Sequence, residues 1–236
     1  MLVAAEFLVD RISRLLLAGM LMLGSYLLIQ EQQILKAADP GLTRRYRPQA
    51  EADPDFAALC AANPDVIAWL QLEGTGIDYP VVQGRTNEEY LNRNAQKQYA
   101  LSGALFLDSG CARDFSGFNS IIYGHHMDGG MMFGDLDRYA DPQFFAAHSQ
   151  GSLYFDGCSH PLEILALACV DAYDPLLYRT DLQDAAGRKE YRERLMAAAV
   201  QKREKPLQEE AQLVLFSTCT SGGANSRYLL AAALKG

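Results

Sequence analysis

Short apolar runs, each bounded by turn-forming residues, fill the chain beyond residue 60 and constrain its fold more than any other feature. The runs are rich in β-branched and aromatic side chains, and Gly, Pro, Asn or Asp separates them, which is typical of β-strands joined by turns. The eight expected strands are Val66–Leu72, Asp78–Val82, Ala104–Leu107, Ser120–Tyr123, Ser152–Phe155, Leu162–Ala172, Leu213–Thr218 and Tyr228–Leu234. Eight mostly sequential strands predict a mainly β fold and favour a closed or nearly closed barrel.

Two helices are expected among these strands. Asp53 stands in an N-cap position before apolar residues at helical spacing, so Asp53–Asn63 predicts a short helix that ends before Pro64 and carries Cys60 in the core. Between the sixth and seventh strands, Asp181–Lys205 has apolar residues at helical spacing among charges. This pattern predicts a long amphipathic helix that packs one face on the body.

The N-terminal region contains a membrane signal. Leu15–Ile29 is a run of fifteen uncharged residues that follows Arg14 and precedes Glu31. As a helix it spans roughly 22 Å, which is short of the roughly 30 Å hydrocarbon core unless Arg14 snorkels toward the surface. We expect an uncleaved anchor, because no small-residue cleavage site follows the run. A cleaved signal peptide and a buried helix remain the alternatives.

These signals divide the chain into three parts. Residues 1–30 are expected to form a cytoplasmic stub and the anchor, residues 31–52 a juxtamembrane linker, and residues 53–236 one folded domain. Basic residues flank the apolar run on both sides, so charge alone does not choose its orientation.

Charge and cysteine content exclude several classes of protein. The chain has 29 acidic and 21 basic side chains, for a net charge of −8, and residues beyond 50 hold more than the whole of this excess. An acidic body argues against nucleic-acid binding, which usually needs a basic face. Five cysteines without a C-x-x-C pair form neither a disulfide framework nor a zinc pattern, and at least one thiol must be free or pair with another chain. We therefore expect no metal site.

Residues with catalytic chemistry occur at three strand ends. Cys219 follows the run LVLFST and precedes a Gly-rich loop, and His125 ends the run SIIYGH before another loop with glycines. Arg227 opens the last strand. A thiol, an imidazole and a guanidinium brought together supply a nucleophile, a general acid/base and an oxyanion partner. Taken singly, each has a plainer interpretation as a buried thiol, a surface histidine or a strand-end arginine.

Several motifs together resemble the sortase family. Phe216-Ser217-Thr218-Cys219 resembles the T-L-x-T-C box of sortases, and Tyr123-Gly124-His125-x-Met127 resembles the histidine box of class B. Arg227 occupies the place of the family's arginine. The segments NPDVIAWL, YPVVQG, GALFLD and MFGDL extend the resemblance from about Asn63 to the C-terminus.

The resemblance implies a closed eight-stranded sortase-type barrel in residues 53–236 and a membrane-anchored cysteine transpeptidase on the outer face of a Gram-positive-type bacterium. Cys219 would be the nucleophile, His125 the general acid/base and Arg227 the oxyanion or substrate-positioning residue. Tyr123, Ser217 and Thr218 would line the groove for the substrate.

The implied substrate is an LPXTG-like or NPQTN-like sorting signal of a surface protein or pilin. The implied acceptor is an amine of a peptidoglycan precursor or of a pilin lysine, and no cofactor is required. The N-terminus would be cytoplasmic and the catalytic domain extracellular. A cysteine endopeptidase that uses water as acceptor and a catalytically silent binding module remain alternatives.

The sequence also departs from the family pattern. Leu215 and Phe216 stand where the box has Thr and Leu, and the gap between Cys219 and Arg227 is short, which affects loop geometry and substrate preference. Other residues near the motifs receive plainer interpretations. Asp108 is expected to orient the imidazole or cap a loop, His126 to face solvent, and Cys111 to lie in an exposed polar loop; Cys158 and Cys169 are expected as core or surface thiols.

Overall fold

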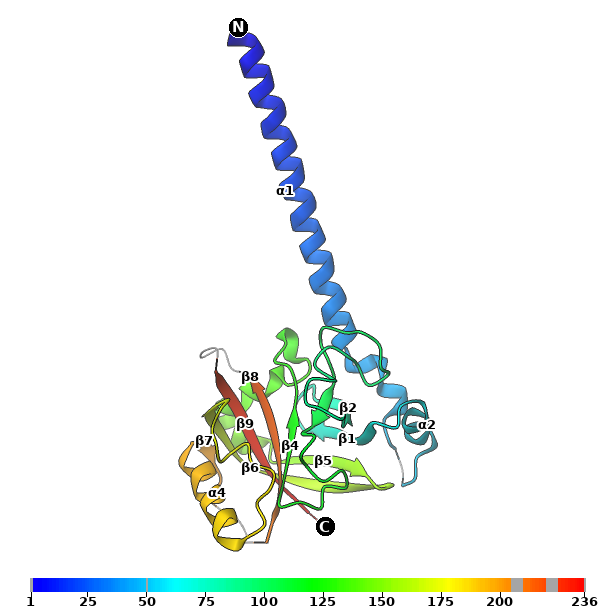
Figure 1. Ribbon diagram of the computed structural model, residues 1–236, viewed down its shortest axis with the longest axis vertical. Helices are drawn as coiled ribbons and strands as arrows, with labels where there is room; N and C mark the ends of the chain where they lie inside the picture. Colours follow the sequence, from blue (N-terminus) through cyan, green and yellow to red (C-terminus); the bar gives the residue numbers. More distant parts are fainter. Residues whose placement is uncertain (1, 50, 205–209, 220–224, 236) are drawn as a thin grey trace.

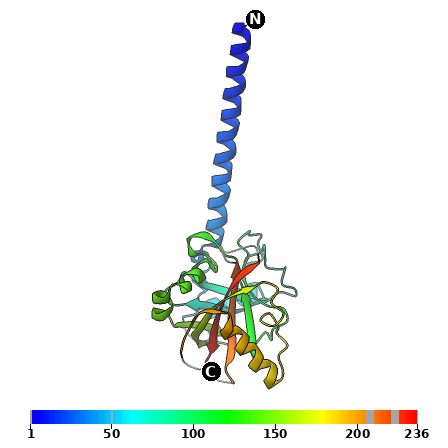
Figure 2. The same cartoon turned by 90° about the vertical axis from the view of Figure 1, so that its left-hand side faces the viewer.

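The computed structural model describes residues 2–49, 51–204, 210–219 and 225–235. One long helix, α1 (Leu2–Ala38), projects from one end of a barrel, and the last strand ends at the opposite end (Figures 1 and 2). The uncharged run Leu15–Ile29 of α1 is exposed along its length. Its segment Val9–Ala38 is long and apolar enough to cross a membrane, although a signal sequence passes the same test.

Short helical turns connect α1 to the barrel. The bounds of these elements are η1 (Pro40–Leu42), η2 (Arg44–Tyr46) and α2 (Pro54–Ala62). The side chain of Asp53 accepts the N–H groups of Asp55 and Phe56, so α2 has the expected N-cap. The helix ends before Pro64, as the sequence predicts, and Cys60 lies on it half-buried.

Eight strands close into a barrel, which confirms the predicted architecture. They are β1 (Val66–Leu72), β2 (Asp78–Val82), β3 (Leu105–Leu107), β4 (Asn119–Tyr123), β5 (Gln150–Phe155), β6 (Cys158–Asp171), β8 (Gln212–Cys219) and β9 (Ser226–Leu234). The order around the barrel is β5-β1-β2-β3-β4-β8-β9-β6, and pairing of β5 with β6 closes it. The pairs β2–β3 and β4–β8 are parallel, and the other pairs are antiparallel.

A ninth strand corrects the prediction of one helix over Asp181–Lys205. Helix α4 covers only Ala185–Ala197, β7 (Ala199–Lys202) follows it, and Lys205 lies outside the described residues. The extra strand forms because β6 is long. β5 pairs with only the first part of one edge of β6. The rest of that edge would leave backbone groups unpaired, and β7 pairs with it instead.

The segment after β4 is also more ordered than the loop that the sequence predicts. It contains η3 (Asp128–Gly130), η4 (Gly134–Ala140) and α3 (Pro142–Ala147). These pieces are too short to show a helical period, and only the Asp141 cap before Pro142 signals one of them.

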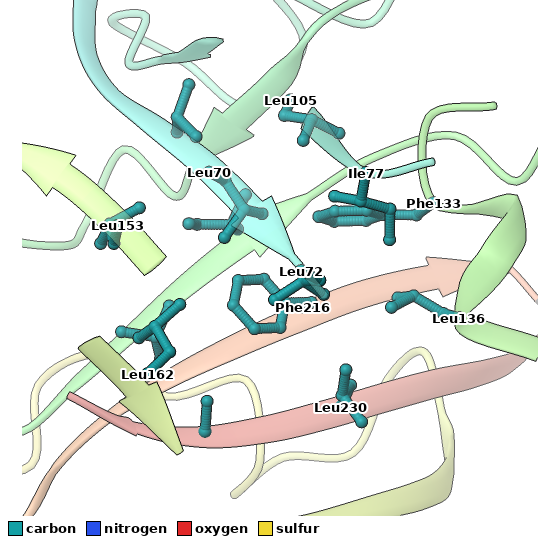
Figure 3. Close-up of a cluster of buried hydrophobic side chains, with 14 of the residues drawn as sticks. Leu70, Leu72, Ile77, Leu105, Phe133, Leu136, Leu153, Leu162, Phe216 and Leu230 are labelled. Atoms are coloured by element: carbon teal, nitrogen blue, oxygen red, sulfur yellow. The ribbon is translucent and has the colours of Figure 1, made fainter. Parts of the chain in front are cut away.

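Two clusters of buried side chains lie on the two faces of the sheet. The barrel interior holds leucines from several strands around Phe216, as Figure 3 shows. The second cluster lies between the sheet and α4, with Tyr191 and Leu195 of the helix against Leu215 and Leu229. Strand β8 therefore alternates between two buried faces, which explains its unbroken apolar sequence.

Candidate active site

Two neighbouring strands lead toward the predicted histidine and cysteine positions at the same end of the barrel. β4 pairs with β8 in parallel, so that Tyr123 lies opposite Ser217. The N–H of Gly124 donates to the carbonyl of Ser217 at 3.2 Å, so the chain continues toward His125 and toward Cys219 from adjacent strand ends. Antiparallel pairing of β8 with β9 places Arg227 opposite Cys219. The side chain of Cys219 lies outside the part of the chain that the structure describes.

The glycine between Tyr123 and His125 has a packing role. A Cβ at Gly124 would lie 2.5 Å from the Leu105 side chain and 2.7 Å from that of Phe133. Side-chain carbons do not approach each other so closely in a packed core. Glycine at position 124 therefore allows the backbone after β4 to pack directly on the core, and His125 follows at the end of the barrel.

One cleft collects the predicted site residues. A cavity of about 600 Å³ is lined by five of them, namely Tyr123, His125, Ser217, Thr218 and Arg227. Its remaining walls include Asn87, Glu88, Leu91, Phe106, Tyr173 and Tyr178. Phe106 lies on β3, and the other five come from the segment between β2 and β3 and from the segment between β6 and α4. The sequence analysis did not find these five, because they lie in irregular segments with no periodicity.

The imidazole of His125 is held by a backbone carbonyl. His125 Nε2 lies 2.9 Å from the carbonyl oxygen of Leu91. A carbonyl oxygen only accepts hydrogen bonds, so Nε2 carries the proton in this contact. In the neutral ring Nδ1 is then the basic nitrogen. The opposite wall of the cleft thereby fixes both the ring and its tautomer.

Asp108 organises the wall beside His125 through Tyr123. Tyr123 Oη donates to Asp108 Oδ2 at 3.0 Å, and Asn87 Nδ2 donates to the same oxygen at 2.9 Å. Burial raises the pKa of Tyr123, and the nearby Asp108 charge raises it further, so the phenol stays protonated. The N–H of Gly110 donates to Asp108 Oδ1. Asp108 thus caps its loop, and the expectation that it orients the imidazole is wrong.

The other wall is tied to β8 by a tyrosine. Tyr178 stacks on Tyr123 with ring centroids 6.3 Å apart, and its hydroxyl lies 3.0 Å from Ser217 Oγ. Beside it, the buried hydroxyl of Thr218 has no hydrogen-bond partner within the described ranges. Tyr178 therefore ties its wall of the cleft to β8.

A buried ion pair holds this wall in place. Arg194 of α4 donates to Asp174 Oδ2 through Nε at 3.1 Å and Nη2 at 2.7 Å. Asp174 Oδ1 accepts the N–H groups of Leu176 and Leu177. Burial opposes ionisation of Asp174, but these N–H groups and Arg194 outweigh it and hold its pKa below the usual range. Tyr191 Oη also donates to the Leu177 carbonyl at 3.0 Å.

Removal of this ion pair is expected to loosen the wall. Because Asp174 is 4% exposed and Arg194 about half exposed, we expect Arg194→Gln to cost ~1–1.5 kcal/mol locally and to speed amide exchange about tenfold. Hydrogen–deuterium exchange at the Leu176 and Leu177 amides measures this effect. Lys189→Gln is the matched control, since Lys189 pairs only with exposed Glu193 on the same helix. Equal amide exchange rates in the two variants would show that the Arg194–Asp174 ion pair does not hold this wall in place.

Two further expectations are corrected. His126 is not solvent-facing but partly buried, with Nε2 2.7 Å from Asp137 Oδ2. Cys111 is buried rather than exposed, and it accepts the N–H of Ile121. Burial raises the pKa of its thiol to about 11. Neither residue lines the cleft, so of the two adjacent histidines only His125 faces it.

The remaining cysteines are thiols in the structure. Cys158 is half-buried and Cys169 is exposed, which agrees with their interpretation as surface thiols. Within the described ranges, no group of three or more His, Cys, Asp or Glu side chains is arranged to hold a metal ion.

Comparison with known proteins places this cleft in a family. No protein-family model matches the sequence. Sortase B of Listeria monocytogenes is 30% identical over 171 residues, a match that covers 72% of this chain and 68% of that protein. A class B sortase of Streptococcus pyogenes involved in pilus biogenesis has a similar crystal structure, with TM-score 0.70, 35% identity and coverage of 76% of this chain and 97% of that chain. Sortase B from the type II pilus of Streptococcus pneumoniae gives TM-score 0.66, 38% identity and coverage of 76% and 98%.

A closed barrel that carries histidine, cysteine and arginine positions at three adjoining strand ends is suited to acyl transfer through a thiol. With the relatives above, the chain belongs to the class B sortase family. It is therefore a cysteine transpeptidase of the kind that anchors surface proteins.

Proposed function

We propose that this protein is a membrane-anchored transpeptidase that cleaves a C-terminal sorting signal and transfers the surface protein to an amine. The observation that carries the proposal is the cleft that His125 and Arg227 both line, with Arg227 paired opposite Cys219 at the end of β8. In this proposal α1 crosses the membrane, its N-terminus is cytoplasmic, and the catalytic domain lies outside a Gram-positive-type cell.

The first half-reaction forms a thioester. The Cys219 sulfur attacks the carbonyl carbon of the Thr in an LPXTG-like or NPQTN-like signal, and the peptide bond after that Thr breaks. His125 accepts the thiol proton at Nδ1 and delivers it to the leaving amine, which departs with the C-terminal fragment. The contact of Nε2 with Leu91 supports this role, because it leaves Nδ1 as the basic nitrogen.

Arg227 and the cleft walls serve the same step. The guanidinium of Arg227 lines the cleft opposite the Cys219 position, where it is suited to stabilise the oxyanion or position the substrate. The proposed groove residues are Tyr123, Ser217 and Thr218. Their place in the lining of the cleft supports this assignment.

The second half-reaction needs an amine that attacks the thioester and restores the thiol. A pilin lysine and a peptidoglycan precursor both supply one. We favour the pilin lysine, because the streptococcal relatives at 35% and 38% identity are described with pili.

The test is a panel of peptides with matched amines. We expect the protein to cleave one LPXTG-like or NPQTN-like peptide and, with hydroxylamine or a diamine present, to give a ligated product that mass spectrometry detects. A pilin fragment with a reactive lysine and a cross-bridge peptide then compete as acceptors. Cleavage with only the hydrolysed product would replace the transpeptidase with an endopeptidase that uses water, and no cleavage would leave a binding module.

A further inference from the structure

Helix α1 does not end in a flexible linker but enters the core of the catalytic domain. Ala38 at its end is 2% exposed, and its carbonyl accepts the hydroxyl of Tyr79 on β2 at 2.9 Å. The same Tyr79 oxygen accepts the N–H of Met132 at 3.1 Å. One buried tyrosine thus joins the end of α1 to the segment that follows β4, and the helix and the cleft-bearing end of the barrel form a fixed joint.

The segment after His125 also runs alongside the helix. A cavity of about 410 Å³ is lined by Leu27, Ile34 and their neighbours on α1 and by Met127 and Asp128 of that segment. Leu27 belongs to the uncharged run Leu15–Ile29. The residues that follow His125 therefore lie level with the helix turns that border a hydrocarbon core.

The length of α1 between the apolar run and Ala38 sets the distance between the catalytic domain and the bilayer. From Glu31, the first charge after the apolar run, to buried Ala38 the helix rises about 10 Å. The headgroup layer on one side of a bilayer is roughly 5–8 Å thick. With the apolar run in the hydrocarbon core, the domain therefore begins directly at the lipid surface, with no spacer.

Exposed apolar side chains gather at this same end. In the described part of the domain the exposed large hydrophobic residues are Leu91, Tyr99, Leu101, Tyr173 and Val200. Leu91 and Tyr173 line the cleft, and Tyr99 lines a cavity together with Ala38. Leu101 stands two residues after Tyr99 in the same segment. Val200 lies elsewhere, on β7 beside α4 (Figure 1). Tyrosines with an exposed ring are typical of membrane interfaces.

Basic side chains surround the joint. Lys36, Arg44 and Arg45 are all exposed within the two turns on either side of Ala38. The rest of the domain is acidic, so these cations stand out. Cations next to a membrane helix attract anionic headgroups by about 1 kcal/mol each.

We propose that the cleft-bearing end of the catalytic domain rests on the lipid bilayer, with Tyr99 and Leu101 in the headgroup layer and the basic residues on anionic lipids. The cleft then lies at the level of the lipid headgroups. This inference rests on the proposed anchoring by α1, but it does not depend on which residue is the nucleophile.

The test places tryptophan at two exposed apolar positions of the full chain in vesicles of phosphatidylcholine and phosphatidylglycerol. The native Trp69 is 3% exposed and gives both variants the same background. Lipids with brominated acyl chains quench tryptophans that reach the membrane. We expect Tyr99→Trp to lose at least about twofold more intensity than Val200→Trp, since only the former lies at the interface.

Each outcome decides the inference. Equal quenching of Tyr99→Trp and Val200→Trp in protein that floats with the vesicles overturns the surface contact and leaves the anchor intact. Failure to float with the vesicles overturns the anchor and this inference together. Cleavage of a soluble sorting-signal peptide by the same vesicles reports the proposed activity separately, so its loss is distinguishable from both.

Discussion

Cys219→Ala is expected to abolish both cleavage and transfer, with a loss of about 10⁴-fold or more, because no other group in the cleft supplies a nucleophile of comparable strength. The expected defect is specific to the covalent step, so the variant still binds the sorting-signal peptide. Intact-protein mass spectrometry measures it directly: the wild-type protein gives a thioester adduct that hydroxylamine releases, and the variant gives none.

Cys169→Ala is the control for this experiment. Cys169 is exposed on β6, and its sulfur lies 3.3 Å from Ser226 Oγ, at the start of the strand that carries Arg227. It is therefore an accessible surface thiol near the same end of the barrel, and its removal should leave turnover unchanged. Retained activity in Cys219→Ala with loss in Cys169→Ala would overturn the assignment of the nucleophile.

His125→Ala is expected to lower kcat/KM by about 10²–10⁴-fold, the usual contribution of a positioned general acid/base. Both half-reactions need the imidazole. It takes the thiol proton and protonates the leaving amine in the first, and it accepts a proton from the attacking amine in the second. Single-turnover cleavage of the peptide therefore slows together with the steady-state rate. Circular dichroism and thermal melting of the variant check that the barrel remains folded.

The neighbouring histidine offers a matched control. The imidazole of His126 contacts Asp137 and does not line the cleft. We expect His126→Ala to keep soluble-peptide turnover within about threefold of the wild-type value, since it touches no reacting atom. The reverse order, with His126→Ala inactive and His125→Ala active, would contradict the tautomer and the role assigned to His125.

The sequence predicted the barrel because strand period and turn chemistry are local signals. Val66–Leu72 and Asp78–Val82 match β1 and β2 residue for residue. The strand ends also predicted five of the residues that line the cleft, since residues that follow adjacent strand ends must meet. The predicted roles of these residues remain to be tested by the substitutions above.

Features that depend on tertiary contacts escaped prediction. β7 forms because β5 is too short to cover the edge of β6, and Ala199–Lys202 alone shows no clear strand period. Asp108 was assigned two alternative roles because its nearness to Tyr123 follows from pairing of β3 with β4 and not from spacing. Leu91 was missed since it contributes a backbone carbonyl, which any residue type supplies.

The order of strands has a consequence for biosynthesis. β9 is made after every other strand of the barrel, yet it lies between β8 and β6 and carries Arg227. β4 must likewise wait for β8, its parallel partner from far along the chain. Such distant pairings form late and slowly. The cleft is therefore complete only when β9 is in place, and a nascent chain is expected to lack activity until then.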